Sequence, residues 1–316
     1  MARWTLHDMP DQSGRLAVVT GASIGGLGYE TALALAGKGA EVVLAGRNPA
    51  KGAAALAAIQ AQHPRAVLRV GALDLASLAS VAAFAETLRR EGRPLDLLVN
   101  NAGVMMLPRR QTTADGFEMQ LGTNYLGHFA LTGRLLDLLR RGRQPRVVNL
   151  ASLAHRRGSI RFDDLQRTAY APWSAYEQSK LAMLMFAFEL QRRSDAGAWG
   201  VTSIAAHPGW SRTELFANGR GASGGGLTQK LFDLAARVFA QSVAAGALPT
   251  LYAATAPAAQ GGAYYGPDGF QELAGAPAAA KIAPQATDQA AAARLWQVSE
   301  QLTGVSFPAA AAARAA

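Results

Sequence analysis

Short runs of β-prone apolar residues alternate, over the first two thirds of the chain, with longer stretches whose apolar positions recur at helical spacing. The first run covers residues 16–20 and leads through a glycine cluster into a helical stretch from about residue 29 to residue 38. Strands that alternate with helices of this length pair in parallel through right-handed crossovers, so we predict an α/β protein with a doubly wound parallel sheet in a single domain. The further strands are expected at residues 41–45, 66–70, 95–99, 146–150 and 201–205, and the further helices at residues 49–62, 77–91, 124–141 and 175–194.

The ends of the chain and one internal segment depart from this pattern. Residues 1–13 are expected to form an N-terminal extension, residues 14–307 the domain, and residues 308–316 a low-complexity alanine tail. Gly, Ser and Asn are frequent just before an amphipathic stretch at residues 227–240. A substrate lid across about residues 214–245 and an ordinary surface helix are equally consistent with this arrangement.

A long uncharged stretch at residues 240–267 raises the question of a membrane span. Gly246, Pro249 and Pro257 interrupt it, so we expect a buried helix and strand there and no integral membrane segment. Residues 1–16 lack the apolar run of a signal peptide, which favours a cytoplasmic protein.

The composition narrows the class of protein further. Half of the 316 residues are apolar and 17% are charged, which is typical of a globular protein with wide buried sheets. The chain has no cysteine, so disulfides and thiolate metal sites are excluded. Its five histidines show no metal-ligand spacing, so we expect no metal site.

The formal net charge is +9, and arginines crowd the middle of the chain. This could indicate a nucleic-acid partner, but the stretch has no interleaved aromatic residues and no nucleic-acid motif. We therefore favour solvated helix ends and loops, with attraction of a phosphate-bearing ligand as a lesser role. The arginines are Arg140, Arg141, Arg143, Arg146, Arg156, Arg157 and Arg161.

The glycine cluster after the first strand has the pattern of a phosphate-binding turn. Its glycines let the backbone turn tightly and approach a pyrophosphate, which then lies at the positive end of the following helix. The second predicted strand leads into Arg47 and Asn48, with no carboxylate at its end. A guanidinium can bind a 2′-phosphate in bidentate fashion, so NADP(H) is expected rather than NAD(H).

Tyr176 and Lys180 are four residues apart in a predicted helix, which places both side chains on one helix face. A neighbouring ammonium stabilises a phenolate. We therefore expect Lys180 to lower the pKa of Tyr176 from its ordinary value of about 10, so that the phenol can exchange a proton at neutral pH.

These motifs together resemble those of the short-chain dehydrogenase/reductase family, and the phrases around them look most like its retinol-dehydrogenase-like branch. The resemblance covers about residues 14–267 and implies a Rossmann fold. The glycine cluster resembles the family's TGxxxGxG turn with one residue inserted, so either Gly25 or Gly26 is the middle glycine. The other matching segments are Asp74–Leu75, Asn100–Gly103, Asn124–His128, Val147–Ser152, Tyr176–Lys180 and His207–Thr213.

The resemblance also implies a role for each matching residue. Tyr176, Lys180, Ser152 and Asn124 are the implied catalytic residues. Ser152 would hydrogen-bond the reacting oxygen, Asn124 would hold a proton-relay water, and Lys180 would also hold the nicotinamide ribose. The cofactor-binding residues, from motif or resemblance, are Gly21, Ser23, Ile24, Gly26, Leu27, Gly28, Arg47, Asn48, Asp74, Leu75, Asn101, Ala102, Gly103, Tyr176, Lys180, Pro208, Gly209, Trp210 and Thr213.

The expected function is reversible NADP(H)-dependent hydride transfer between a ketone or aldehyde and the corresponding alcohol, as in a carbonyl reductase or alcohol dehydrogenase. The expected partner is a small, lipophilic carbonyl or alcohol substrate, and pairing into a homo-oligomer stays open. One alternative is an NADPH-binding regulator or scaffold without turnover. Another is an epimerase or dehydratase, which needs a larger carboxyl-terminal substrate domain than the residues after Thr213 provide.

Some remaining residues have two interpretations. Met105, Met106, Leu107, Trp173 and Phe216 either line an apolar substrate pocket or belong to the general core. The histidines His128, His155 and His207 are expected to make structural hydrogen bonds rather than to act as acid/base catalysts.

Overall fold

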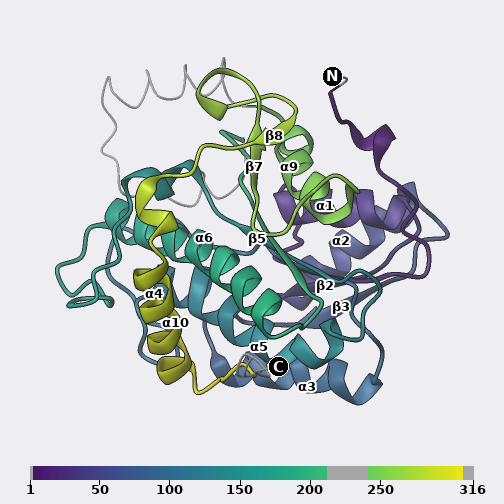
Figure 1. Cartoon of the computed structure of the whole chain (residues 1–316). Coiled ribbons are helices and arrows are strands. Elements are labelled where there is room, and N and C mark those ends of the chain that lie inside the picture. The colour runs from purple at the N-terminus through teal and green to yellow at the C-terminus, as the bar shows by residue number, and fades with distance from the viewer. Residues whose placement is uncertain (1–2, 212–240, 309–316) are drawn as a thin grey trace, which may run out of the picture.

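One eight-stranded sheet runs through the computed structural model, which describes residues 3–211 and 241–308 (Figure 1). Its strand order is β3-β2-β1-β4-β5-β6-β7-β8, with seven parallel strands and an antiparallel β8 at one edge. The predicted doubly wound parallel sheet is confirmed. The strands are β1 Leu16–Thr20, β2 Glu41–Gly46, β3 Leu68–Ala72, β4 Leu97–Asn100, β5 Arg146–Leu150, β6 Thr202–Ala206, β7 Tyr264–Pro267 and β8 Pro277–Ala279.

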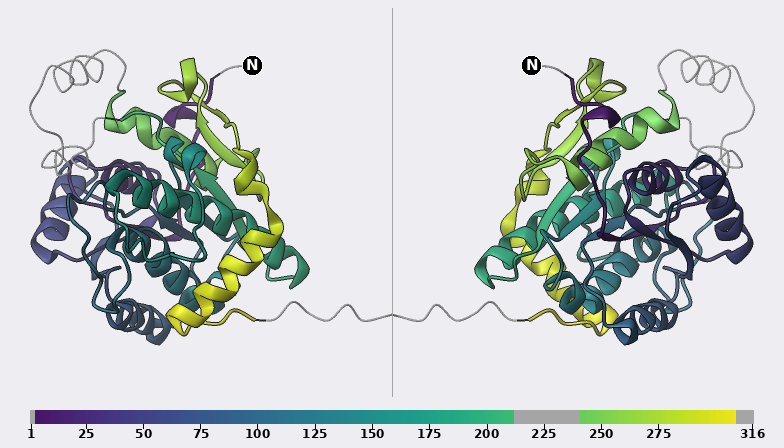
Figure 2. Two further views of the ribbon diagram at one scale, coloured as in Figure 1. Left: turned by 90° about the vertical axis from the view of Figure 1, so that its left-hand side faces the viewer. Right: turned by 90° about the vertical axis from the view of Figure 1, so that its right-hand side faces the viewer.

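Helices cover both faces of the sheet, as Figure 2 shows from two sides. One face carries α1 (Leu27–Gly37), α2 (Pro49–Gln62) and α9 (Val243–Thr255). The other carries α3 (Leu78–Glu91), α5 (Gly127–Leu139), α6 (Pro172–Ala196) and α10 (Gln289–Thr303), with the short α4 (Met119–Leu121) beside α6.

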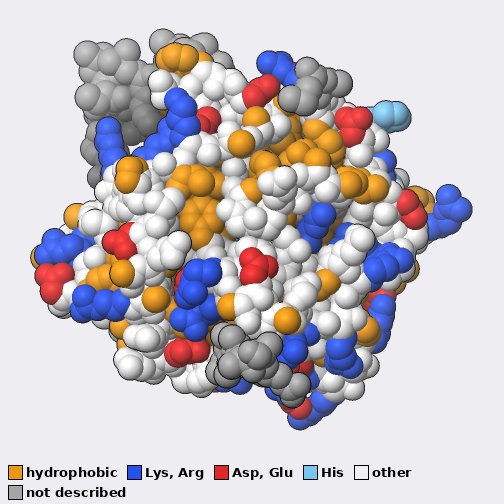
Figure 3. All heavy atoms as spheres, viewed as in Figure 1, with side chains coloured by type: hydrophobic (Ala, Val, Ile, Leu, Met, Phe, Trp, Pro, Cys, Tyr) orange, Lys and Arg blue, Asp and Glu red, His pale blue; other side chains and the backbone are white. Residues whose placement is uncertain are grey.

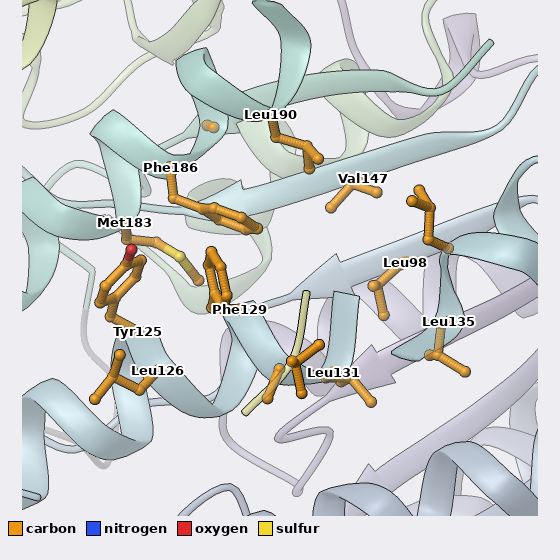
Figure 4. Close-up of a cluster of buried hydrophobic side chains, with 14 of the residues drawn as sticks. Leu98, Tyr125, Leu126, Phe129, Leu131, Leu135, Val147, Met183, Phe186 and Leu190 are labelled. Carbon is orange, nitrogen blue, oxygen red and sulfur yellow. The ribbon is translucent and has the colours of Figure 1, made fainter. Parts of the chain in front are cut away.

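This double cover explains why the strands are apolar throughout. Successive strand residues point to opposite faces, so Val18 faces the helices on one side of the sheet and Val19 those on the other, and both are fully buried. Figure 4 shows the centre of the larger core, where the Phe129 ring lies beside Tyr125 and Phe186. Trp296 of α10 also contacts the Phe129 ring, with 5.1 Å between ring centroids.

Several element boundaries differ from the sequence prediction. The third strand lies at residues 68–72 rather than 66–70. The helix expected at residues 124–141 begins earlier, at Met119, and passes through a π-helical turn at Gly122–Leu126 before α5. This turn carries Asn124, whose side chain hydrogen-bonds to Val104 and Ser179 outside the helix.

The carboxyl-terminal part of the sheet was only partly predicted. The buried helix and strand expected at residues 240–267 are confirmed as α9 and β7. The helix α10 was not predicted, although Asp288 caps its first turn by accepting from Ala291 N and Gly304 ends it with a φ of 63°.

Three expectations fall on residues outside the described ranges. They are the helix at residues 227–240, most of the lid at about residues 214–245, and all but the first residue of the alanine tail. Within the described residues, no helix is long and apolar enough to cross a membrane.

Most of the clustered arginines lie on helix ends and loops, whereas Arg146 begins β5. Figure 3 shows Lys and Arg side chains scattered among acidic ones over the face seen there. Arg161 pairs with Asp163 on the surface. Arg146 is half-buried, and its guanidinium donates to the carbonyl oxygens of Ala253 and Ala256, each at 2.9 Å.

Replacing Phe129 with alanine removes the ring at the centre of the larger core. We expect Phe129→Ala to lower the free energy of unfolding by about 3–5 kcal/mol, because burial is lost and a cavity is left behind. Phe270 is 80% exposed and serves as the matched control, with Phe270→Ala expected to change stability by less than about 0.5 kcal/mol. Chemical denaturation of both variants checks this, and equal losses would contradict the assignment of Phe129 to the core.

Candidate active site

A cavity of about 420 Å³ lies where the strand order reverses, between the carboxyl ends of β1 and β4. Parallel α/β sheets bind their ligands at such switch points. The turns after β1 to β6 contribute to its lining, as does the first part of α6. Nearly all of the predicted cofactor-binding residues line this cavity: Gly21, Ser23, Ile24, Gly26, Leu27, Arg47, Asn48, Asp74, Leu75, Asn101, Ala102, Gly103, Tyr176, Lys180, Pro208 and Gly209.

The inserted residue of the glycine turn is taken up by a local reversal of the backbone. Gly25 adopts a left-handed φ of 80°, and Gly26 N donates to Ser23 O at 3.1 Å. Gly26 then precedes the first residue of α1 and lines the cavity, whereas Gly25 does not. Gly26, rather than Gly25, therefore occupies the position of the middle glycine.

Gly28 serves packing rather than lining. A Cβ at this position would lie 2.5 Å from Asn101 Nδ2 and 2.6 Å from Gly21 O, so a side chain would push α1 away from the turn. The same Asn101 Nδ2 donates to Thr20 O at 2.7 Å. Gly28 thus lets the helix, the turn after β1 and the turn after β4 pack against one another.

The Thr20 hydroxyl also holds the turn after β1 against the turn after β4. Its Oγ1 accepts from Asn101 N and from Ala102 N, each at 2.9 Å, and lies 2.9 Å from His128 Nε2. His128 Nδ1 donates to Asn124 O at 2.9 Å, and its Nε2 faces a hydroxyl oxygen that already accepts from two N–H groups, so Nε2 carries no proton and the imidazole is neutral. Burial lowers the pKa of His128 to about 4. Its geometry is that of a structural histidine.

Two basic residues lie where β2 ends. Arg47 and Lys51 both line the cavity, and within the described residues neither side chain has a carboxylate partner. Asn48 caps α2 by accepting from Lys51 N at 3.1 Å, which directs the first turn of this helix at the cavity. The sequence analysis missed Lys51, although a basic residue in the first turn after Arg47 was a usable signal.

Tyr176 and Lys180 are both buried on α6 and both line the cavity. Lys180 Nζ donates to Leu150 O at 2.8 Å and lies 5.8 Å from the centroid of the Tyr176 ring. Ser152, just past β5, also lines the cavity and interacts with the Tyr176 side chain. The structure therefore brings these three predicted residues together.

The expected lowering of the Tyr176 pKa is wrong for this arrangement. Burial raises the pKa of Tyr176 to about 12, and the hydrogen bond with the Ser152 side chain offsets only part of this. Burial also lowers the pKa of Lys180 to about 8. The physical reason is desolvation: both groups are removed from water, which favours the neutral form of each.

Asn124 lies beside this group but does not line the cavity. Its Oδ1 accepts from Val104 N at 2.7 Å, and its Nδ2 donates to Val104 O at 3.0 Å and to Ser179 Oγ at 2.9 Å. The side chain therefore fastens the loop after β4 to α6, one residue before Lys180.

Of the remaining predicted residues, some line the cavity and others do not. Trp210 does not line the cavity, and its backbone N donates to Leu273 O at 2.8 Å. Met105 and Trp173 line the cavity, and the Trp173 ring stacks on Tyr176 with 5.7 Å between centroids. Met106 and Leu107 do not line it, and Thr213 and Phe216 lie outside the described residues.

Among the residues that the structure covers, no group of three His, Asp or Glu side chains could hold a metal ion.

Comparison with known proteins gives consistent matches over most of the chain. The family model described as short chain dehydrogenase matches residues 15–222. Retinol dehydrogenase 13 of Homo sapiens is 41% identical over 299 residues, which cover 93% of this chain and 86% of that protein. Polyprenol dehydrogenase of Mus musculus is 44% identical over 303 residues, with 94% and 86% covered. A crystal structure of an uncharacterised protein from Mycobacterium paratuberculosis is 39% identical with a TM-score of 0.79, covering 97% of this chain and all of that one.

The neutral His128 predicts a loss of stability in acid. Its folded pKa of about 4 lies below the ordinary 6.5, so the unfolded chain binds the extra proton first as the pH falls. We expect His128 alone to remove about 3 kcal/mol of unfolding free energy between pH 6.5 and pH 4. In denaturation at several pH values, His128→Gln should be less stable at pH 7 but show a flatter pH dependence. An unchanged slope would contradict this.

Proposed function

The chain belongs to the retinol-dehydrogenase-like branch of the short-chain dehydrogenase/reductase family, and we propose that it transfers hydride reversibly between NADP(H) and a lipophilic ketone, aldehyde or alcohol. Family membership supports NAD(P)-dependent oxidoreduction of alcohols and carbonyls. The observation that carries the finer proposal is that the buried Tyr176 and Lys180 line one cavity together with Ser152 and the glycine turn.

The lining of the cavity fits a dinucleotide. Gly21 lines the cavity with a left-handed φ of 71°, and a Cβ on it would lie 2.9 Å from the Cα of Ala102, so only glycine lets this turn pack against the turn after β4. The start of α1 adds the positive end of a helix. A bound dinucleotide would supply the hydride from its nicotinamide ring, and the residues of this chain would bind it, orient the substrate and move the proton.

Tyr176 is the proposed acid and base. With a pKa of about 12 the phenol keeps its proton at neutral pH, which is the form needed to protonate the oxygen of a carbonyl during reduction. The Ser152 hydroxyl, which also lines the cavity, is proposed to hydrogen-bond the same oxygen. An ammonium on Lys180 stabilises the phenolate that proton donation leaves behind, so its burial beside the ring serves the proton transfer.

Arg47 and Lys51 support the preference for NADP(H). Neither cation has a carboxylate partner in the part of the chain that the structure describes, so the two can share a 2′-phosphate, whereas a ribose 2′-hydroxyl gives them no charge to bind. The apolar substrate is supported by Trp173 and Met105 beside Tyr176. It is also supported by the names of the two relatives, which refer to the apolar alcohols retinol and polyprenol.

The alternative of an NADPH-binding regulator has less support. The inserted glycine-turn residue favoured it, but the turn at Gly25 absorbs this residue without closing the cavity. Burying a lysine beside a phenol costs stability, and a protein that only binds NADPH gains nothing in return for this cost.

Removing the Tyr176 hydroxyl tests the proposed chemistry. We expect Tyr176→Phe to lower kcat for ketone reduction by at least about 10²-fold, since general acid catalysis is typically worth that much. Tyr252 lies on α9 outside the cavity, so Tyr252→Phe is the matched control and should keep kcat. Initial rates of NADPH oxidation with ketones of graded size measure both variants. Near-normal turnover in Tyr176→Phe would reject the assignment.

Removing the two cations tests the cofactor preference. We expect Arg47→Leu with Lys51→Leu to raise KM for NADPH by roughly 10-fold or more and to leave KM for NADH within about 2-fold, because charge-assisted bonds to the 2′-phosphate are lost. Arg65 is exposed and outside the cavity, so Arg65→Leu should change neither value. Equal changes for both dinucleotides would argue against a 2′-phosphate site.

A further inference from the structure

A buried charged cluster lies behind the Pro208–Gly209 turn, and the proposed chemistry does not use it. Glu272 Oε2 lies 3.0 Å from His207 Nε2 and 2.7 Å from Arg156 Nη2. Glu272 Oε1 accepts from Lys281 N at 3.0 Å. His207 is fully buried and Glu272 is 9% exposed, so both carboxylate oxygens are engaged away from bulk solvent.

The backbone that carries this carboxylate is strained. Gln271 and Glu272 are consecutive non-glycine residues with left-handed φ values of 51° and 60°. L-residues avoid this region because Cβ crowds the following carbonyl oxygen, and two in succession persist only where surrounding contacts hold them. At Glu272 these contacts are His207, Arg156 and Lys281 N.

His207 links Glu272 to the turn that lines the cavity by hydrogen bonds. Its Nδ1 accepts from Gly209 N at 3.2 Å, so the proton resides on Nε2, which donates to the carboxylate. Gly209 has a left-handed φ of 62°, and a Cβ there would lie 2.8 Å from Glu272 O. The strained loop therefore packs directly against a turn that lines the cavity.

Arg156 links Glu272 to the segment that begins at Ser152. It belongs to a short 3₁₀ helix, Leu153–Arg157. Ser152 caps this helix, because its Oγ accepts from Ala154 N. The neighbouring His155 donates from Nδ1 to Ser152 O at 2.7 Å and accepts at Nε2 from Ala283 N at 3.3 Å. Both sides of the cavity near Tyr176 are thus bonded to residues 272–283.

We propose that Glu272 is a positioning residue, which holds the Pro208–Gly209 turn through His207 and the Ser152 segment through Arg156. This rests on the proposed function and deepens it. The strand order separates the turn after β6 from Arg47 at β2 by three strands, β1, β4 and β5. Glu272 therefore shapes the nicotinamide end of the site and leaves the adenine end unaffected.

The test compares two glycine substitutions on adjacent strained residues. Glu272→Gly relieves the left-handed backbone and removes the carboxylate, whereas Gln271→Gly relieves the backbone alone. We expect Glu272→Gly to lower kcat for ketone reduction by at least about 10-fold and to weaken NADPH binding several-fold. Gln271→Gly should keep both values. Adenosine 2′,5′-bisphosphate, which lacks the nicotinamide half, should bind wild type and both variants within about 2-fold.

Conservative variants separate positioning from a general loss of structure. Glu272→Gln keeps one acceptor oxygen, which can accept from His207 Nε2 or from Lys281 N but not from both, so its kcat should lie between those of wild type and Glu272→Gly. If Glu272→Gly melts below the assay temperature, Glu272→Asp takes its place, and the shorter carboxylate should lower kcat with unchanged binding of the bisphosphate. Wild-type kcat and NADPH affinity in a folded Glu272→Gly or Glu272→Asp, or an equal loss of bisphosphate binding, overturns the proposal.

The two proposals fail in different ways. If wild type consumes no NADPH with any carbonyl, the proposed function fails. The role of Glu272 is then still decided by binding, because weaker NADPH binding with unchanged bisphosphate binding supports it and unchanged NADPH binding rejects it.

Discussion

Covering a parallel sheet with helices on both faces decides where this chain can place polar chemistry. Strand residues such as Val18 and Val19 are buried on opposite faces, so the sheet itself offers no room for charged side chains. Polar groups gather where the strands end. Because all strands from β1 to β7 point the same way, six of their carboxyl-end turns meet around one cavity. The Thr20 hydroxyl and Gly28 keep the two central turns in contact there.

Burial also determines the protonation states within the site. Tyr176, Lys180 and His128 are all removed from water, which raises the pKa of the phenol and lowers the pKa values of the amine and the imidazole. For His128 the neutral form is required, because its Nε2 faces the Thr20 hydroxyl without a proton. Among the described residues Lys180 donates only to Leu150 O, and its burial costs stability. Such costs are usual at sites whose groups exchange protons.

The carboxyl-terminal segment contributes to both the core and the site. Trp296 of α10 packs on Phe129 in the larger core. Glu272 and Ala283, from the segment that precedes α10, bond to His207 and His155 behind the cavity. Residues from the last part of the chain thereby support a site whose recognised motifs end at Thr213.

The sequence by itself determined the features that depend on neighbouring residues. Short apolar runs indicated the strands, and apolar positions at helical spacing indicated the helices. The glycine cluster indicated the turn after β1, and the four-residue interval indicated that Tyr176 and Lys180 share a helix face. Only the tertiary structure decided that Gly26 lines the cavity, that Lys51 joins Arg47, that the Tyr176 pKa rises, and that Glu272 reaches His207. The physical reason is that burial and hydrogen bonding between residues distant in the chain depend on how the elements pack, which a local pattern does not contain.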